Sequence, residues 1–187
     1  MKRWVLKSGA TTLEGLILGD AVKPEPGPGE VRVRIRAVSL NYREQLILGN
    51  AGGNWRIDRD LIPVADGAGD IDAIGEGVEQ WTPGDKVITV YLRDFIHWPP
   101  HAGIGLGLVG LFNFGDVIEP GLFLAKGVSV RGIPVGSRDG LEEVVDFVDK
   151  HQIKPVIDRV VPFGDAKQAY QAQSAPDLLG KIVIEIA

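Results

Sequence analysis

The chain has 187 residues, 44% of them hydrophobic and 24% charged, the balance of a soluble globular protein with room for a sizeable core. A formal net charge of -5 with scattered Lys and Arg residues argues against a nucleic-acid partner, because nucleic-acid binding needs clustered basic side chains. The absence of cysteine excludes disulfides, thiolate catalysis and Cys-ligated zinc. The N-terminal segment lacks the apolar core of a secretory signal and no run is long enough to span a membrane, so we expect a cytoplasmic location and no membrane partner.

The first hundred residues predict a small all-β barrel or sandwich. Residues 31–37 alternate apolar side chains with three arginines, the period-two pattern of a strand with one apolar and one charged face. The segment 24–29 before it is rich in proline and glycine, which indicates a rigid connection. We interpret the three arginines as a solvated strand face rather than an anion site. Further short apolar segments, punctuated by Gly, Asp and Pro, continue at strand spacing through residue 92.

The second half has a different pattern, in which helices are expected between buried strands. Residues 105–111 and 127–136 are glycine-bounded apolar runs, typical of strands that are buried on both faces of a parallel sheet. Residues 137–152 predict a helix with Ser137 as its N-cap. The apolar residues of this helix share one face: they are Leu141, Val144, Val145 and Val148.

The last 34 residues predict a strand, a short helix and a terminal strand. The strands are expected at 154–162 and 180–186. The helix between them, within residues 163–174, is expected to pack through Ala166, Ala169 and Tyr170.

Residues 105–110 match the G-x-G-x-x-G pattern of a dinucleotide-binding loop. Such a loop follows a strand and opens a helix, so that the pyrophosphate meets the free N–H groups at the helix N-terminus. Here the pattern follows Pro99-Pro100 and runs into a predicted strand. The acidic residue expected near positions 125–130 is also missing. We therefore interpret the pattern as a coincidence of composition.

Five segments occur in an order that resembles the medium-chain dehydrogenase/reductase superfamily, in particular its zinc-independent quinone oxidoreductase and alcohol dehydrogenase-like members. The segments are residues 24–50, 63–87, 124–138, 153–171 and 180–186. The resemblance implies a mixed α/β fold in which a GroES-like β-barrel catalytic domain is joined to a remnant, late strands and a helix, of a Rossmann domain.

The resemblance also implies the domain organisation. Residues 1–100 and 153–187 correspond to the catalytic domain, and residues 101–152 to the truncated Rossmann remnant. Relative to the family, on the order of a hundred residues are absent, including the first β-α-β unit and its glycine-rich loop.

The same resemblance argues against a metal site. Zinc-using relatives place a Cys where this chain has the segment around Asn41, and a His-Glu pair where it has Ala65-Asp66. His97 and His101 are separated by Trp and two prolines, which forbid the helix that would bring both rings to one face. We expect no metal and no zinc.

Zinc-independent members contact substrate or nicotinamide through the segment that matches Asn41 and Tyr42, and these are the candidate catalytic residues. An amide and a phenol hydrogen-bond a carbonyl oxygen as negative charge develops on it. Glu44 and Asp66 are the candidate substrate-pocket residues. From the residues alone, these site roles have plainer alternatives that stay equally open. Tyr42 is then a packed barrel residue and Glu44 a surface acid. The match to the loop that covers nicotinamide gives three candidate cofactor-binding residues, Leu111, Phe112 and Asn113.

The resemblance implies an oxidoreductase lineage that uses NAD(P)H on a small carbonyl or quinone. The missing domain argues against hydride transfer by this chain alone, because a cofactor held only at its nicotinamide end loses most of its binding energy. Two alternatives stay open: an active NAD(P)H oxidoreductase with a partner subunit or an unusual cofactor site, and a cofactor-free binding or assembly protein. The strand from Gly127 to Ile133 matches the family's dimer seam, so we expect a homodimer.

Overall fold

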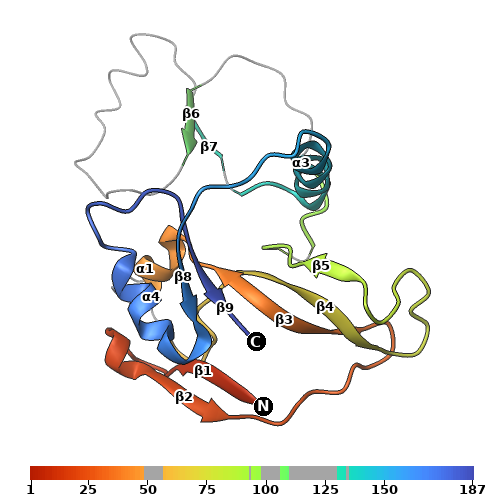
Figure 1. The fold of residues 1–187 in the computed structure, drawn as a ribbon, viewed down its shortest axis with the longest axis horizontal. Coiled ribbons are helices and arrows are strands. Elements are labelled where there is room, and N and C mark those ends of the chain that lie inside the picture. Colours follow the sequence, from red (N-terminus) through yellow and green to blue (C-terminus); the bar gives the residue numbers. More distant parts are fainter. Residues whose placement is uncertain (49–56, 93, 98–105, 110–129, 134) are drawn as a thin grey trace. The chain divides into compact units, whose positions relative to one another are not determined.

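The structure, a computed structural model, describes residues 1–48, 57–92, 94–97, 106–109, 130–133 and 135–187 (Figure 1). The chain divides into two units. The first joins Met1–Thr89 to Lys154–Ala187, and the second is Val90–Ile153. The mixed α/β fold class is confirmed, while the assignment of residues 101–152 to a Rossmann remnant stays a prediction.

The first unit is built on a five-stranded sheet of order β5-β4-β3-β9-β8 (Figure 1). Its central strand, β3, is the predicted alternating strand, and it pairs antiparallel with β4 on one side and with β9 on the other. β8 and β9 are parallel, and the chain passes from one to the other through the helix α4. The strands are β3 (Val31–Ser39), β4 (Asp66–Ile74), β5 (Lys86–Ile88), β8 (Ile157–Pro162) and β9 (Lys181–Glu185).

The N-terminal hairpin and the first helix are not evident from the sequence pattern. The hairpin pairs β1 (Lys2–Leu6) with β2 (Leu16–Asp20), and the helix α1 spans Tyr42–Leu48. A short 3-10 turn, Leu13–Gly15, precedes β2. Leu6 and Leu16, directly opposite in the hairpin, are both fully buried, so the hairpin belongs to the core of this unit.

The core of the first unit lies where this hairpin, β9 and the helix α4 (Ala166–Ala172) meet. Ala166, Ala169 and Tyr170 form the buried side of α4, as the sequence predicted. The Tyr170 hydroxyl donates to the carbonyl oxygen of Pro63 at 3.0 Å, which satisfies the polar end of a buried ring. A 3-10 turn, Phe163–Asp165, leads into α4.

The second unit contains a parallel strand pair and a helix. The strands β6 (Leu106–Val109) and β7 (Val130–Ile133) confirm the predicted parallel pairing. The helix α3 (Arg138–Lys150) begins after Ser137, whose hydroxyl oxygen accepts a hydrogen bond from the Gly140 N–H at 3.3 Å. The predicted N-cap is therefore confirmed.

The apolar face of α3 is only partly buried: Leu141 and Val148 are half-buried, and Val144 and Val145 are exposed. Val144 and Val145 are 57% and 44% exposed, and Phe147 is 56% exposed. The helical periodicity predicted the helix correctly, but periodicity alone does not supply a surface for its apolar side chains to pack against.

Candidate functional site

The candidate site lies at the start of α1, where the chain leaves β3. Asn41 directly precedes the helix, and Glu44 lies three residues further on. The Glu44 carboxylate accepts a hydrogen bond from the Asn41 backbone N–H at 2.6 Å, while the Glu44 N–H donates to the Asn41 carbonyl oxygen at 3.2 Å. This is one half of a capping box, in which a residue in the first turn reaches back to the residue before the helix. Glu44 thus fixes the backbone of Asn41.

Glu44 is fully buried, so its interpretation as a surface acid is wrong. Burial raises the pKa of Glu44, because a charged carboxylate loses its hydration there; the Asn41 N–H and the Arg43 guanidinium oppose this rise. The Arg43 Nη1 lies 3.2 Å from Glu44 Oε1. Burial also raises the pKa of Tyr170, and the Glu44 charge adds to that effect. The acid therefore acts inside the unit and does not line the pocket described below.

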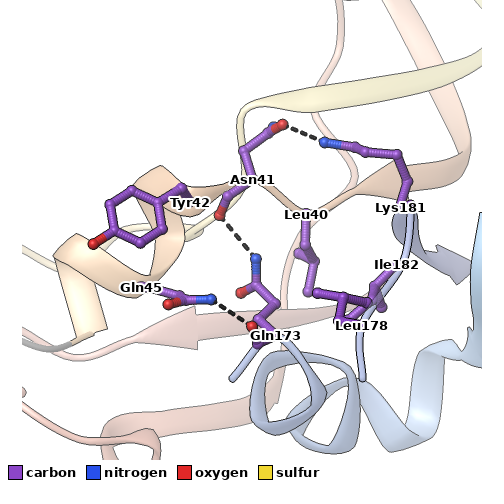
Figure 2. A pocket seen from close by; sticks show the side chains of 9 residues that line it. Leu40, Asn41, Tyr42, Gln45, Gln173, Leu178, Lys181 and Ile182 are labelled. Atoms are coloured by element: carbon purple, nitrogen blue, oxygen red, sulfur yellow. Dashed lines mark hydrogen bonds between the residues drawn. The ribbon is translucent and has the colours of Figure 1, made fainter. Parts of the chain in front are cut away.

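The Asn41 side chain is held between a carboxylate and an ammonium group. Its Nδ2 donates to Asp66 Oδ2 at 2.8 Å, and the Ser39 carbonyl oxygen lies 3.5 Å from the same nitrogen. Its Oδ1 accepts from Lys181 Nζ at 2.5 Å (Figure 2). These partners fix the amide orientation, since an ammonium only donates and a carboxylate only accepts. The result is a chain of contacts from Asp66 through Asn41 to Lys181.

A pocket of about 250 Å³ lies beside this chain of contacts (Figure 2). It is lined from the loop before α1, from α1 itself, from the segment after α4 and from the start of β9. Its lining residues are Leu40, Asn41, Tyr42, Gln45, Gln173, Leu178, Gly180, Lys181 and Ile182.

Gln173 ties the two sides of the pocket together. Its Nε2 donates to the Asn41 carbonyl oxygen at 2.8 Å, and its own carbonyl oxygen accepts from Gln45 Nε2 at 2.8 Å. Its Oε1 is buried without a hydrogen-bond partner. The wall of the pocket is thus crosslinked between α1 and the end of α4, which holds the lining side chains in place.

The structure brings together three of the residues named from the sequence. Asn41 and Tyr42 line the pocket, Tyr42 with 40% of its surface exposed, and Asp66 contacts Asn41. Glu44 lies behind Asn41. The candidate cofactor-binding residues 111–113 fall outside the described residues. The roles of all these residues in catalysis or binding stay predictions.

Sequence reasoning missed Lys181 and Gln173. Lys181 is 140 positions from Asn41 in the chain and Gln173 is 132 positions away. A lysine that opens an apolar strand and a glutamine that ends a helix are ordinary features, and no local spacing links them to Asn41. The Asn-x-x-Glu spacing at residues 41–44 was a usable signal for the capping contact.

Within the residues that the structure describes, no group of three or more His, Asp or Glu side chains is arranged to hold a metal ion. At Asn41 the chemistry is also unsuitable for a cation. The Lys181 ammonium already occupies the amide oxygen that a metal would need and adds a positive charge beside it.

The described residues do not form a dinucleotide cradle. The four central residues of the G-x-G-x-x-G pattern, Leu106–Val109, lie in the strand β6 instead of a loop that opens a helix. The pattern therefore does not present free N–H groups to a pyrophosphate in the described part of the chain. The described part of the chain also contains no helix with the length and apolar character needed to cross a membrane.

Comparison with known proteins places this geometry in context. Residues 27–112 match the family model of the alcohol dehydrogenase GroES-like domain. A zinc-type alcohol dehydrogenase-like protein of Schizosaccharomyces pombe is 34% identical over 106 residues, covering 50% of this chain and 30% of that protein. A chloroplastic quinone-oxidoreductase of Triphysaria versicolor is 31% identical over 78 residues, covering 36% of this chain and 21% of that protein. The chain thus spans less than a third of the length of these relatives.

Among solved structures, an NAD-dependent alcohol dehydrogenase superposes with a TM-score of 0.76 at 16% identity, over 100% of both chains. At this identity the likeness shows the fold alone. Together with the matched domain and the relatives, it confirms the resemblance to the medium-chain dehydrogenase/reductase superfamily, with residues 27–112 similar to the GroES-like domain of the alcohol dehydrogenases.

Proposed function

We propose that this chain is a ligand-binding domain of oxidoreductase lineage whose pocket takes a small ketone, enone or quinone. The observation that carries the proposal is the pair of Asn41 and Lys181 at one wall of the pocket, with Asp66 hydrogen-bonded to Asn41 outside the lining. A carbonyl oxygen needs hydrogen-bond donors, and this wall supplies them. The relatives named as a dehydrogenase-like protein and a quinone-oxidoreductase support the same ligand class.

The apolar lining and the size of the pocket favour a small ligand. Leu40, Leu178 and Ile182 add hydrocarbon surface to the lining. A cavity of about 250 Å³ lies below the roughly 300–1,000 Å³ of pockets for drug-sized molecules. A single ring with one carbonyl group suits this combination of volume and polarity.

In this proposal the chain does not transfer hydride alone. The nicotinamide cofactor of such enzymes is held mainly through its phosphates and ribose, and the described residues offer no cradle for these groups. The second candidate is an active NAD(P)H oxidoreductase that obtains its cofactor site from a partner subunit or from an unusual site, which the oxidoreductase names of its relatives favour. The cofactor-free binding or assembly protein is the third.

Thermal unfolding with two kinds of ligand separates these candidates. Acetophenone at millimolar concentration is expected to raise the melting temperature, because a ligand that binds only the folded state stabilises it. NADPH and NADH at sub-millimolar concentration are expected to leave both the melting temperature and the nicotinamide fluorescence unchanged. A shift with either nucleotide would favour the active oxidoreductase. No shift with acetophenone or other small carbonyls would refute the proposed ligand class.

We also propose that two copies associate through the strand from Gly127 to Ile133. In the part that the structure describes, β7 pairs with β6 along one edge, and a strand edge without a partner tends to pair with an identical one. Replacing Val130 by Pro removes a backbone donor from this strand and should produce monomer or aggregate. Light scattering that finds a folded monomer of the unmodified chain at micromolar concentration would refute the dimer. A cytoplasmic location belongs to the same proposal, and cell fractionation tests it.

A further inference from the structure

We propose that Lys181, and not Asn41, is the residue that donates a hydrogen bond to the ligand's carbonyl oxygen. This inference rests on the proposed function, namely that the pocket binds a small carbonyl compound. It assigns a role to a residue that the sequence pattern did not single out, and it changes the role of Asn41 from a ligand contact to a positioning residue.

The hydrogen bonds of Asn41 are already committed to the protein. Of its two amide hydrogens, one is donated to Asp66 Oδ2 at 2.8 Å, and the second has the Ser39 carbonyl oxygen 3.5 Å from the nitrogen. Its amide oxygen accepts from Lys181. Turning the amide toward a ligand would break the charge-assisted bonds to Asp66 and from Lys181, which are stronger than neutral ones. Without turning, Asn41 has only the hydrogen on the Ser39 side to offer.

Lys181 has donors to spare at the same wall of the pocket. An ammonium carries three N–H groups, and one is used on Asn41. No described carboxylate pairs directly with this ammonium. Figure 2 shows the Lys181 side chain running from β9 toward Asn41, with its nitrogen at the amide oxygen. The positive charge is therefore held in place by a neutral group and stays available to a ligand.

The charge gives Lys181 the chemistry that the proposed ligand needs. A hydrogen bond from an ammonium to a carbonyl oxygen is stronger than one from an amide. Such a donor also stabilises negative charge that builds up on that oxygen when electrons reach the carbonyl group. Asn41 and, through it, Asp66 set the position of the ammonium at the pocket wall.

The test compares two ligands of the same shape. Acetophenone carries a carbonyl oxygen, and α-methylstyrene carries a CH₂ group in its place. The unmodified chain is expected to bind acetophenone about tenfold or more tightly than α-methylstyrene. Lys181→Met, which keeps an unbranched side chain but no donor, is expected to lose this preference while it binds α-methylstyrene as before. Lys86→Met is the matched control, since Lys86 is an exposed lysine on a strand of the same sheet.

Asn41 is tested with the same ligand pair. Asn41→Leu removes the acceptor that holds Lys181 and should reduce the acetophenone preference. Asn41→Ser, whose hydroxyl can accept from the ammonium through one water, should restore part of it. A purely structural role of either residue would instead weaken both ligands equally.

A second measurement needs no variant. In the unmodified chain with labelled lysine, the NMR signals of the Lys181 side chain should shift on adding acetophenone and stay in place on adding α-methylstyrene. The inference would be overturned if Lys181→Met kept the preference for acetophenone, or if the Lys181 signals stayed in place while acetophenone bound. Either result would leave the proposed function standing. An unmodified chain that binds neither acetophenone nor other small carbonyls would overturn both.

Discussion

Replacing the buried Glu44 is the sharpest test of how the site is held together. In the unmodified chain the Asn41 N–H donates to the Glu44 carboxylate at 2.6 Å. Glu44→Gln keeps an oxygen that can accept this hydrogen bond and removes the charge. Glu44→Ala removes the acceptor as well. An unpaired buried N–H costs about 1–3 kcal/mol, and lost packing adds to this cost, so Ala should lower the free energy of unfolding by about 2–4 kcal/mol. Gln should change it by about 1 kcal/mol or less at neutral pH.

The raised pKa of Glu44 determines whether the free energy of unfolding rises or falls with pH. Burial raises the pKa of Glu44 in the folded state above the ordinary value of 4.5 for a glutamate. An acid whose pKa is raised by folding makes its full contribution to stability below the unfolded-state pKa. That contribution is lost as the pH rises through the folded-state pKa. The free energy of unfolding of the unmodified chain, minus that of Glu44→Gln, should therefore fall as the pH rises above 4.5.

Urea unfolding followed by tryptophan fluorescence at several pH values measures both quantities. The subtraction is needed because hydrogen bonds to lysine or arginine lower the pKa of several aspartates, whose contributions are lost at acidic pH in both proteins. A difference that stays flat from pH 4.5 to pH 8 would show that Glu44 is not perturbed by burial. An Ala variant as stable as the Gln variant would show that the Asn41 N–H does not depend on this acceptor.

Three further results are expected. Tyr170→Phe leaves the buried Pro63 carbonyl oxygen without its donor and should lower the free energy of unfolding by about 1–3 kcal/mol, measured in urea; an unchanged midpoint would contradict the 3.0 Å contact. Gly75→Ala should destabilise by about 1–3 kcal/mol, because its Cβ would lie 1.8 Å from the Gly27 carbonyl oxygen, whereas Gly19→Ala meets nothing within 4 Å and should be neutral; equal melting temperatures of the two variants would refute the crowding. Elemental analysis of the purified chain should find no stoichiometric zinc, and one tightly bound zinc per chain would overturn that expectation.

The strands and the last helices were predictable because their patterns are local. The alternation in residues 31–37 predicts a strand, and β3 is that strand in the middle of the sheet, with its apolar residues half-buried and Arg34 and Arg36 exposed. The spacing of Ala166, Ala169 and Tyr170 puts them on one side of α4, where they are buried. Each of these predictions depends on neighbours within one element, so the sequence order alone carries the information.

The parts that escaped prediction depend on distant contacts. The first strand contains charged residues, so its sequence did not indicate a buried hairpin. The buried leucines of this hairpin, Leu6 and Leu16, come into contact only after folding. Nothing local showed that Glu44 would be fully buried, although the Asn-x-x-Glu spacing signals its contact with the Asn41 N–H. Lys181 lies near the other end of the chain, and the charge pattern within β9 does not indicate its contact with Asn41.

The 140 positions between Asn41 and Lys181 have a consequence for how the protein is made. At about 5–20 residues per second, a ribosome needs roughly 7–28 s to travel from one residue to the other. During that interval β3 has been synthesised but β9, its partner at Ala37–Ser39, has not, and that edge of the strand is open. The arginines of β3 then discourage pairing with another nascent chain, since charges along an exposed edge oppose aggregation. Arginines that form ion pairs in the folded protein, Arg32 with Asp72 and Arg36 with Asp70, thus also protect the chain before its last strand is made.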